Sequence, residues 1–235
     1  MTFNLIGTGL NEKSLTLEAL ELIKKSDSVY LENYTVDFPY DKKILEKVTG
    51  KKIEELPREK VESEDFIKTA KKQEISLLVY GDALSATTHS ELILSCKKNK
   101  VPFKIIHNAS VLTAISEAGL QLYKFGKTSS MPTWKENWRP DSFIEIIKQN
   151  LSIEAHTLLL IDIALPIEKA KQQMKEALKN QKLEIGKIVV CSELGVNSKI
   201  QYDKIDKISD KIKSPFCFII PGKFHFLEEE FLENL

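Results

Sequence analysis

The segment ISLLVYGDALSATTHSEL, residues 75–92, indicates the fold class of this chain. Its first part, Ile75–Tyr80, is a continuous apolar run that ends at Gly81 and Asp82. Runs of this kind are typical of parallel strands that helices cover on both faces. Small residues follow, and then a helix predicted for Glu91–Lys98. A buried strand, a turn and a helix in this order predict one unit of a parallel α/β sheet.

The same alternation of strand and helix extends through the N-terminal half of the chain. Further strands are predicted for Phe3–Ile6, Ser28–Leu31, Lys52–Leu56 and Phe103–His107, and helices for Leu15–Lys25, Lys42–Val48, Glu64–Lys72 and a segment from Ser110. Alternation at this spacing predicts an α/β lobe with a mostly parallel sheet over residues 1–122.

The C-terminal half, residues 123–235, predicts a second α/β lobe, which we expect to contain a mixed sheet. Its strands are predicted for His156–Ile163, Lys187–Cys191, Lys199–Tyr202 and Phe216–Ile220, and its helices for Asp141–Gln149, Pro166–Asn180 and His225–Asn234. The segment Met131–Pro140 carries both tryptophans and two prolines. We interpret this segment as the linker into the second lobe.

The composition excludes several classes of protein. The 235 residues are 42% hydrophobic, which is enough for a substantial core, and the 34 basic residues balance the 34 acidic ones. A balanced charge argues against a broad basic face for nucleic acid, because neutralising phosphates requires a surplus of Lys and Arg. No apolar stretch approaches about 18 residues, and Met1–Gly9 lacks basic flanks, so we expect neither a membrane span nor a signal peptide.

The cysteines indicate a reducing compartment. Cys96, Cys191 and Cys217 lie far apart and form no CxxC pair, so they predict neither a disulfide framework nor a zinc site. We expect buried thiols and a cytoplasmic protein.

Common catalytic and phosphate-binding motifs are absent from the sequence. It contains no GxxxxGK[ST], GxGxxG, HExxH or GxSxG pattern, and its four histidines are scattered. We therefore expect no metal site. The remaining candidates are loops at the carboxyl ends of strands, where ligands collect in open α/β sheets. These loops are Gly7–Leu10, Gly81–His89, Asn108–Val111, Asp162–Pro166 and Pro221–His225.

The loop Gly81–His89 is the densest in small residues. Such a composition lets the backbone approach a ligand, but it equally suits a plain strand-to-helix turn capped by Thr87 or Thr88. Composition alone leaves both interpretations open.

Seven blocks of sequence resemble one known family. They are IGTGL at 6–10, GDALSATTHSEL at 81–92, HNAS at 107–110, GLQLYKFGKT at 119–128, NWRPDSF at 137–143, HTLLLIDI at 156–163 and PGKFH at 221–225. Together they resemble the diphthine synthases, which are class III S-adenosylmethionine-dependent methyltransferases of the tetrapyrrole-methylase fold. The blocks run in the family's order over nearly the whole chain.

The resemblance implies a function. In the family, S-adenosyl-L-methionine, folded in the cleft between two lobes, methylates the amino group of a 3-amino-3-carboxypropyl histidine on translation elongation factor 2. The product is diphthine, in diphthamide biosynthesis, and some members also form a methyl ester. The resemblance further implies a homodimer. A methyltransferase of the same fold for a tetrapyrrole or an RNA, and a non-catalytic cofactor-binding relative, stay open as alternatives.

Position by position, the resemblance also implies the contacts with the cofactor. They are Leu10, Asp82, Ser85, Ser110, Val111, Ile161, Leu194 and Phe216. Most of these side chains are small or apolar, so we expect many contacts through backbone groups. Asp82 either accepts hydrogen bonds from the cofactor or fixes the turn that precedes the next helix. We name no catalytic base, since His89 and His107 are more simply interpreted as histidines that cap or pack under helices.

The chain departs from the family pattern at three positions. Ala83 stands where the family usually has proline, Glu193 lies in a segment that usually carries an arginine, and Ala164 replaces a lysine. The last two changes remove positive charge from the second lobe.

A basic and aromatic segment suggests a docking surface. Trp134 and Trp138 lie close in sequence to Lys127, Lys135 and Arg139. Such a segment suits a protein partner that presents a carboxylate. Simple packing of the tryptophans on the lobes would explain the same residues.

Overall fold

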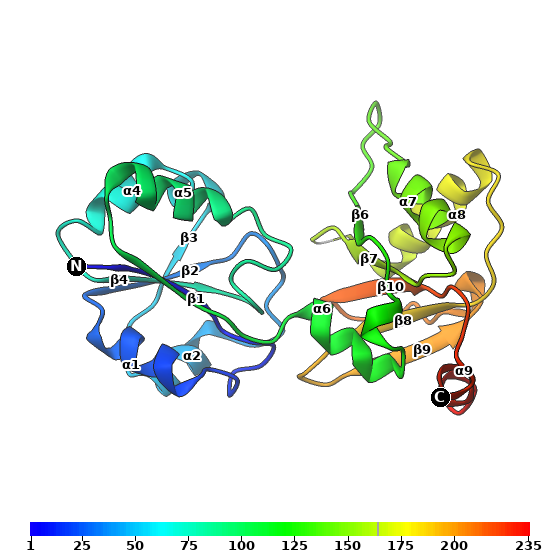
Figure 1. Cartoon of the computed structure of the whole chain (residues 1–235), viewed down its shortest axis with the longest axis horizontal. Helices are drawn as coiled ribbons and strands as arrows, with labels where there is room; N and C mark the ends of the chain where they lie inside the picture. The colour runs from blue at the N-terminus through cyan, green and yellow to red at the C-terminus, as the bar shows by residue number, and fades with distance from the viewer. Residues whose placement is uncertain (164) are drawn as a thin grey trace. The chain divides into compact units, whose positions relative to one another are not determined.

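The apolar run Ile75–Tyr80 contains a strand of a parallel sheet, as the sequence predicts, and the structure places that strand in the middle of the sheet. In the computed structural model, which describes residues 1–163 and 165–235, five parallel strands take the order β3-β2-β4-β1-β5 (Figure 1). Their bounds are β1 Phe3–Gly7, β2 Ser28–Glu32, β3 Glu54–Leu56, β4 Ile75–Val79 and β5 Phe103–Ile106. The register pairs Leu5 of β1 with Leu77 of β4 and Ile105 of β5.

Helices cover both faces of this first sheet, which explains why its central strands β1 and β4 are buried along their whole length. The helices of this unit are α1 Leu17–Lys25, α2 Lys42–Thr49, α3 Arg58–Val61, α4 Glu64–Thr69 and α5 Ser90–Asn99. The helices α1 and α2 lie on one face and α4 and α5 on the other (Figure 1). Along β4, Leu77 packs in the cluster with α4 and α5, and Leu78 in the cluster with α1 and α2. The period of two along the strand therefore sends alternate side chains into separate cores.

The second sheet is mixed, as expected. Its order is β6-β7-β10-β8-β9, with β6 parallel to β7 and the other pairs antiparallel. The strands are β6 Ser129–Met131, β7 Thr157–Ile161, β8 Ile188–Ser192, β9 Lys199–Asp203 and β10 Phe216–Ile220. The helical segments of this part are η1 Ile115–Ala118, η2 Leu122–Lys124, α7 Ser142–Ser152, α8 Ile167–Asn180, η3 Ile205–Lys207 and α9 Phe226–Glu233, and the short helix α6 Val111–Ala114 precedes them in the chain.

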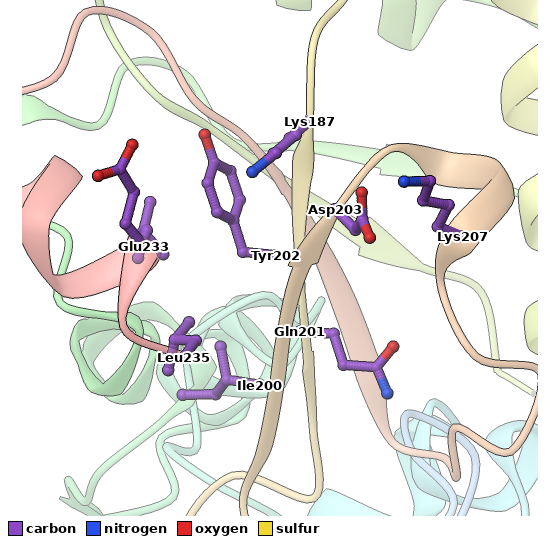
Figure 2. Close-up of a pocket in the computed structure, with 9 residues that line it drawn as sticks. Lys187, Ile200, Gln201, Tyr202, Asp203, Lys207, Glu233 and Leu235 are labelled. Carbon is purple, nitrogen blue, oxygen red and sulfur yellow. The ribbon is translucent and has the colours of Figure 1, made fainter.

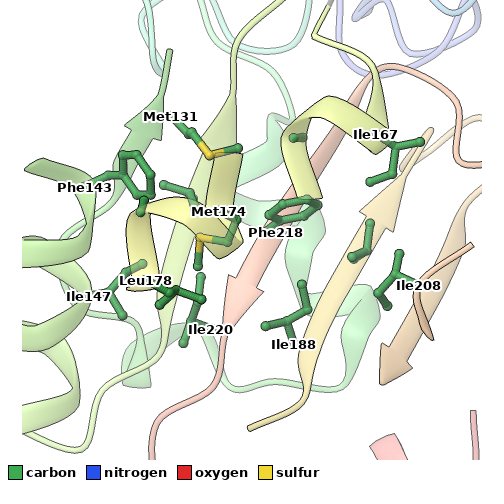
Figure 3. Close-up of a cluster of buried hydrophobic side chains, with 14 of the residues drawn as sticks. Met131, Phe143, Ile147, Ile167, Met174, Leu178, Ile188, Ile208, Phe218 and Ile220 are labelled. Atoms are coloured by element: carbon green, nitrogen blue, oxygen red, sulfur yellow. The ribbon is translucent and has the colours of Figure 1, made fainter. Parts of the chain in front are cut away.

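The core of the second unit lies between its sheet and the helices α7 and α8. Phe143 and Ile147 from α7 meet Met174 and Leu178 from α8 over the central strand residue Phe218 (Figure 3). These five side chains are buried. Their spacing on the helices, four residues apart, is the helical period that presents one apolar stripe to the sheet.

The chain divides into two compact units, residues 1–113 and 114–235. The sequence interpretation set the boundary at residues 122 and 123, whereas the structure divides the chain between Thr113 and Ala114, because η1 contacts β8 of the second sheet. The interpretation of Met131–Pro140 as a linker is wrong: β6 ends at Met131 and pairs with β7, so the segment lies within the second unit.

Three further features concern the cysteines, membrane-spanning helices and the departure at Ala164. Cys96, Cys191 and Cys217 are free and buried. Among residues 1–163 and 165–235, no helix has the length and apolar character needed to cross a membrane. The departure at Ala164 lies outside the described residues.

Candidate functional site

The topology of the first sheet marks a ligand-binding position between β1 and β4. From β1 the chain passes through α1 to β2, and from β4 it passes through α5 to β5, so the two connections leave in opposite directions. The helices α1 and α5 cover opposite faces. Ligands of open α/β sheets bind outside the carboxyl ends of the strands at such a switch point.

Two glycines join the loops at this switch point. The amide of Gly9 donates to the carbonyl of Gly81 at 3.0 Å, and the amide of Gly81 donates to the carbonyl of Gly9 at 2.9 Å. Both have positive φ, 72° and 73°, a region that favours glycine. A Cβ on neighbouring Gly7 would lie 2.6 Å from the Gly81 oxygen. The two loops therefore meet through backbone atoms alone.

The carboxylate of Asp82 binds four donors from two loops. Oδ1 accepts hydrogen bonds from the Leu84 amide at 3.0 Å and the Ser85 hydroxyl at 3.1 Å. Oδ2 accepts from the Asn108 amide at 3.0 Å and from Nδ1 of His107 at 2.8 Å. The Asp82 side chain is 8% exposed. These contacts fix the turn after β4 and attach it to the loop after β5.

The hydrogen bonds also set the charge of Asp82. Burial opposes ionisation of the carboxyl group, but the bonds from the Leu84 and Asn108 amides, His107 and Ser85 outweigh it and hold the pKa of Asp82 below its usual value. Asp82 is therefore an anion at neutral pH.

Asn108 completes the connection between the loops. Its Nδ2 donates to the carbonyl of Gly7 at 3.1 Å and to that of Ser14 at 2.9 Å. With the Gly9–Gly81 pair and Asp82, it joins the loops after β1, β4 and β5 into one unit. We call residues 7–10, 80–85 and 107–111 the strand-end cluster.

The strand-end cluster contains five of the eight residues predicted to contact the cofactor. They are Leu10, Asp82, Ser85, Ser110 and Val111. Leu10 and Ser110 are buried, and Ser85 and Val111 are half-buried. The Tyr80 hydroxyl, which the sequence did not single out, donates to the Leu10 carbonyl at 3.0 Å and so holds the first loop.

Ala83 and His89 have structural roles in the turn after β4. Nδ1 of buried His89 donates to the Ala83 carbonyl at 3.1 Å, and its Nε2 accepts from the Tyr34 hydroxyl at 3.4 Å. The carbonyl of Ala83 also accepts from the Thr87 hydroxyl at 3.1 Å. Hydrogen bonds thus hold this turn where the family usually has proline. His89, not Thr87 or Thr88, is the N-cap residue of α5, and it makes no side-chain cap bond.

The other three predicted residues lie together where three neighbouring strands of the second sheet begin or end. They are Ile161, Leu194 and Phe216. Ile161 ends β7, Leu194 follows β8, and Phe216 begins β10. Because β10 runs antiparallel between β7 and β8, its start lies beside their ends, and Phe216 is opposite Ser192. Glu193, one of the departures, has a positive φ of 49°, and its amide donates to the Pro215 carbonyl at 2.9 Å.

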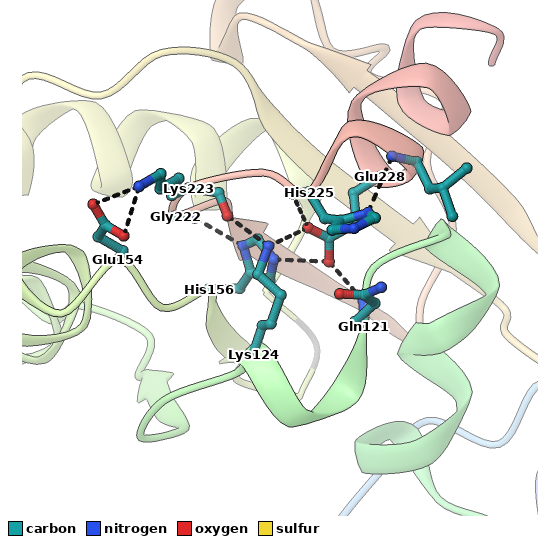
Figure 4. A network of polar contacts seen from close by, with 9 residues as sticks. Gln121, Lys124, Glu154, His156, Gly222, Lys223, His225 and Glu228 are labelled. Carbon is teal, nitrogen blue, oxygen red and sulfur yellow. Dashed lines mark hydrogen bonds and ion pairs between the residues drawn. The ribbon is translucent and has the colours of Figure 1, made fainter.

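A buried polar network in the second unit was not predicted from the sequence. Glu228 Oε1 accepts from the Gln121 amide at 2.8 Å and from Nε2 of His156 at 3.2 Å (Figure 4). Glu228 Oε2 accepts from the His225 amide at 2.7 Å and from Lys124. The network attaches the start of α9 to η2 and to the start of β7. The family blocks YKFG, HTLLLIDI and PGKFH each contribute a residue to this network and are the sequence signal that could have indicated it.

The protonation state of His156 follows from its partners. Its Nδ1 accepts from the Gly222 amide at 2.8 Å, so the ring hydrogen is on Nε2, which donates to Glu228. Burial lowers the pKa of His156 despite the neighbouring Glu228 carboxylate. The imidazole is therefore a neutral structural group.

A hollow of 590 Å³ lies along the outer edge of β9 in the second unit (Figure 2). Its lining includes Lys187, Asp203 and Lys207, and Lys187 Nζ lies 4.7 Å from the centre of the Tyr202 ring. Asp203 pairs with Ile188 at the start of β8, whereas Leu194 follows the end of that strand. The charged side of the hollow thus lies at the opposite end of β8 from Leu194, one of the residues predicted to contact the cofactor.

No group of three or more His, Cys, Asp and Glu side chains that could hold a metal ion occurs within residues 1–163 and 165–235.

Asp82→Asn is expected to destabilise the first unit nearly as much as Asp82→Ala. An amide group has only one acceptor oxygen, so its Nδ2 would face the Leu84 or the Asn108 amide and leave that donor unsatisfied. The expected loss is about 1–3 kcal/mol of unfolding free energy, measured by urea denaturation. Asp65→Asn, at a side chain that is 93% exposed, is the control. A nearly silent Asp82→Asn variant would contradict the role of the four donors.

Glu228 is expected to make stability sensitive to acid. Burial opposes its ionisation, but the Gln121 and His225 amides, Lys124 and His156 outweigh burial and lower the pKa of Glu228 from 4.5 to about 2. The resulting stabilisation is complete above pH 4.5 and is lost as the pH falls toward 2. It amounts to on the order of 3 kcal/mol.

The measurement is the unfolding free energy across this pH range in the wild type and in Glu228→Gln. The variant lacks the ionisable group, so its stability should fall less steeply with acid. Glu229→Gln, at the exposed neighbouring carboxylate, should follow the wild-type curve. Parallel curves for wild type and Glu228→Gln would disprove the assignment.

Comparisons with known proteins agree with this architecture. The family model of the tetrapyrrole (corrin/porphyrin) methylases matches residues 2–206. The chain is 44% identical over 179 residues to the diphthine methyl ester synthase of Schizosaccharomyces pombe, covering 75% of this chain and 62% of that protein. The aligned segment thus spans less than two thirds of that relative's length.

Two solved structures are similar over almost the whole chain. One, from Entamoeba histolytica and provisionally assigned as a diphthine synthase, has a TM-score of 0.91 and 35% identity, and covers 99% of this chain and 97% of its own. The other, a diphthine synthase, has a TM-score of 0.90 and 30% identity, and covers 100% of this chain and 95% of its own. This chain therefore belongs to the tetrapyrrole methylase family, in its diphthine synthase branch.

Proposed function

We propose that this protein is a methyltransferase that uses S-adenosyl-L-methionine to methylate the amino group of a 3-amino-3-carboxypropyl histidine on translation elongation factor 2. The observation that carries the proposal is the strand-end cluster. It lies at the switch point of a parallel sheet and contains five residues that the family resemblance assigns to the cofactor. The companion assignment of Ile161, Leu194 and Phe216 stays a prediction, as do the homodimer and the cytoplasmic location.

The groups present in the strand-end cluster fit such a cofactor. Glycines at 7, 9 and 81 leave backbone without side chains at the crossing of two loops. Next to the cluster, the Tyr40 hydroxyl is buried beside Thr8 without a hydrogen bond of normal geometry to the described residues. Small side chains, backbone groups and this hydroxyl suit a ligand with hydroxyl, amino and carboxylate groups.

The methyl transfer itself requires little participation by acidic or basic side chains. When bound, S-adenosyl-L-methionine supplies an electrophilic methyl group on a sulfonium. The protein's part is to hold the nucleophile in line with that methyl group, and orientation of this kind is worth about 7–11 kcal/mol of the barrier. The rigid, hydrogen-bonded loops of the strand-end cluster are suited to that task.

The names of the curated relatives extend the proposal to a second nucleophile. The Schizosaccharomyces pombe relative is a diphthine methyl ester synthase, and we extend the proposal to methylation of the substrate carboxylate. A carboxylate with a pKa of about 3.5 is already ionised at neutral pH. It therefore needs no proton acceptor before it reacts.

The wild-type protein is expected to bind S-adenosyl-L-methionine and to transfer its methyl group to elongation factor 2 that bears the aminocarboxypropyl histidine. Calorimetry measures binding, and mass spectrometry of the modified peptide counts methyl groups on the amine and the carboxylate. Binding without transfer to this protein would favour a non-catalytic relative. Transfer only to a tetrapyrrole or an RNA would favour a same-fold methyltransferase with another substrate.

A hairpin in the second unit supports docking of the protein substrate. Lys135 and Trp138 pair through backbone hydrogen bonds of 3.0 and 3.2 Å, and the Trp138 side chain is 52% exposed. Trp134 instead packs on the core, and its Nε1 donates to the Pro140 carbonyl at 2.9 Å. Arg139 binds Glu176 at 3.2 Å and so is already paired. The surface for a partner therefore comprises Lys135 and Trp138.

Replacing Lys135 and Trp138 with alanine is expected to weaken methylation of the protein substrate. An exposed tryptophan at the centre of an interface contributes about 2 kcal/mol or more, so KM should rise about 30-fold or more. The affinity for S-adenosyl-L-methionine should not change. Tyr123→Ala, which removes another aromatic side chain that is 81% exposed, is the control. An unchanged KM in the double variant would exclude this hairpin as the docking surface.

A further inference from the structure

We propose that His107, held by Asp82, is the catalytic proton acceptor for the N-methylation steps. The inference rests on the proposed function and adds a residue to which nothing else assigns a chemical role. His107 follows β5 directly and lies within the strand-end cluster.

The contact with Asp82 determines which nitrogen of His107 is basic. Asp82 is an anion, and its Oδ2 lies 2.8 Å from Nδ1 of His107. An anionic oxygen only accepts, so Nδ1 carries the hydrogen and the lone pair of the neutral ring is on Nε2. A carboxylate that orients an imidazole in this way is a recurrent arrangement in acid–base catalysis.

The exposure of His107 distinguishes it from two other histidines. His89 and His156 are buried, and both ring nitrogens of each are engaged with other groups of the protein. The side chain of His107 is 68% exposed. A proton taken up on its Nε2 can therefore pass to water before the next cycle.

N-methylation requires a proton acceptor at every step. The substrate amine begins as an ammonium group, and its proton passes to the Nε2 lone pair of His107. The freed nitrogen lone pair then attacks the methyl carbon, the C–S bond breaks, and its electron pair stays on sulfur. Three methyl groups added to one ammonium therefore release three protons, and each passes from His107 to water.

The carboxylate of the aminocarboxypropyl group provides an internal comparison, because it belongs to the same substrate as the amine. An ionised carboxylate attacks the methyl group without losing a proton, so ester formation has no need of His107. Loss of the imidazole should slow methylation of the amine and spare methylation of the oxygen. A residue that merely holds the loops would affect both reactions alike.

The test is the His107→Asn variant. The Asn side chain can still donate an N–H to Asp82, but it has no group equivalent to the basic Nε2. At pH 7, N-methylation of modified elongation factor 2 should slow about 10-fold, because roughly one tenth of an amine with a pKa of about 8 is already unprotonated. The rate of ester formation on a substrate already trimethylated and the calorimetric affinity for S-adenosyl-L-methionine should match the wild type. Lys104→Ala, on exposed β5 surface, should leave all three unchanged.

A second measurement uses pH. Above the pKa of an α-type amine, about 8, the substrate loses its proton to water, and N-methylation by His107→Asn should approach the wild-type rate. An unchanged rate of N-methylation at neutral pH would overturn the inference. So would an equal loss of N-methylation, ester formation and cofactor affinity, which indicates a structural role. A wild type that binds the cofactor but methylates nothing would instead refute the proposed function and this inference with it.

Discussion

The carboxylate of Asp82 is the group on which the arrangement of the strand-end cluster depends. A parallel sheet brings the ends of β1, β4 and β5 together, but the loops that follow have no regular hydrogen-bonding pattern of their own. Asp82 provides acceptors for two donors in its own turn and two in the loop after β5. Its short side chain leaves little freedom, so the two loops take one relative position. The rest of the cluster, including Asn108 and the glycine pair, is built on that position.

In the second unit, Glu228 likewise fixes segments that have no regular hydrogen-bonding pattern of their own. There, a carboxylate at the start of α9 accepts hydrogen bonds from segments around residues 121, 156 and 225 (Figure 4). In both units a buried carboxyl group has a pKa below its usual value, because several donors outweigh the cost of burial. Removal of either carboxylate leaves those donors without a partner, which is more costly than losing a surface ion pair.

These two networks give a physical reason for the sequence blocks that carry the family resemblance. The block around Asp82 and the block HNAS meet in the first unit, and YKFG, HTLLLIDI and PGKFH meet in the second. Residues of these blocks donate to the two carboxylates: Asn108 of HNAS to Asp82, and Lys124 and His156 to Glu228, which itself lies just after PGKFH. Much of the resemblance therefore lies at points where the loops are attached to one another.

The sequence by itself determined most of the strands and helices and the class of each sheet, although it did not indicate β6 or the short helix α3. Apolar runs such as Ile75–Tyr80 and the four-residue spacing of Phe143 and Ile147 are local patterns, and local patterns are enough to predict which segments are buried. The sequence also named the loops at the carboxyl ends of the strands. Only the tertiary structure decided what the polar side chains contact. The donors to Asp82 lie up to 26 residues away in the chain and those to Glu228 up to 107, and no local pattern reports on partners that folding alone brings together. For the same reason Trp134 and Trp138, four residues apart, differ in burial: one packs against the core and the other is exposed on a hairpin.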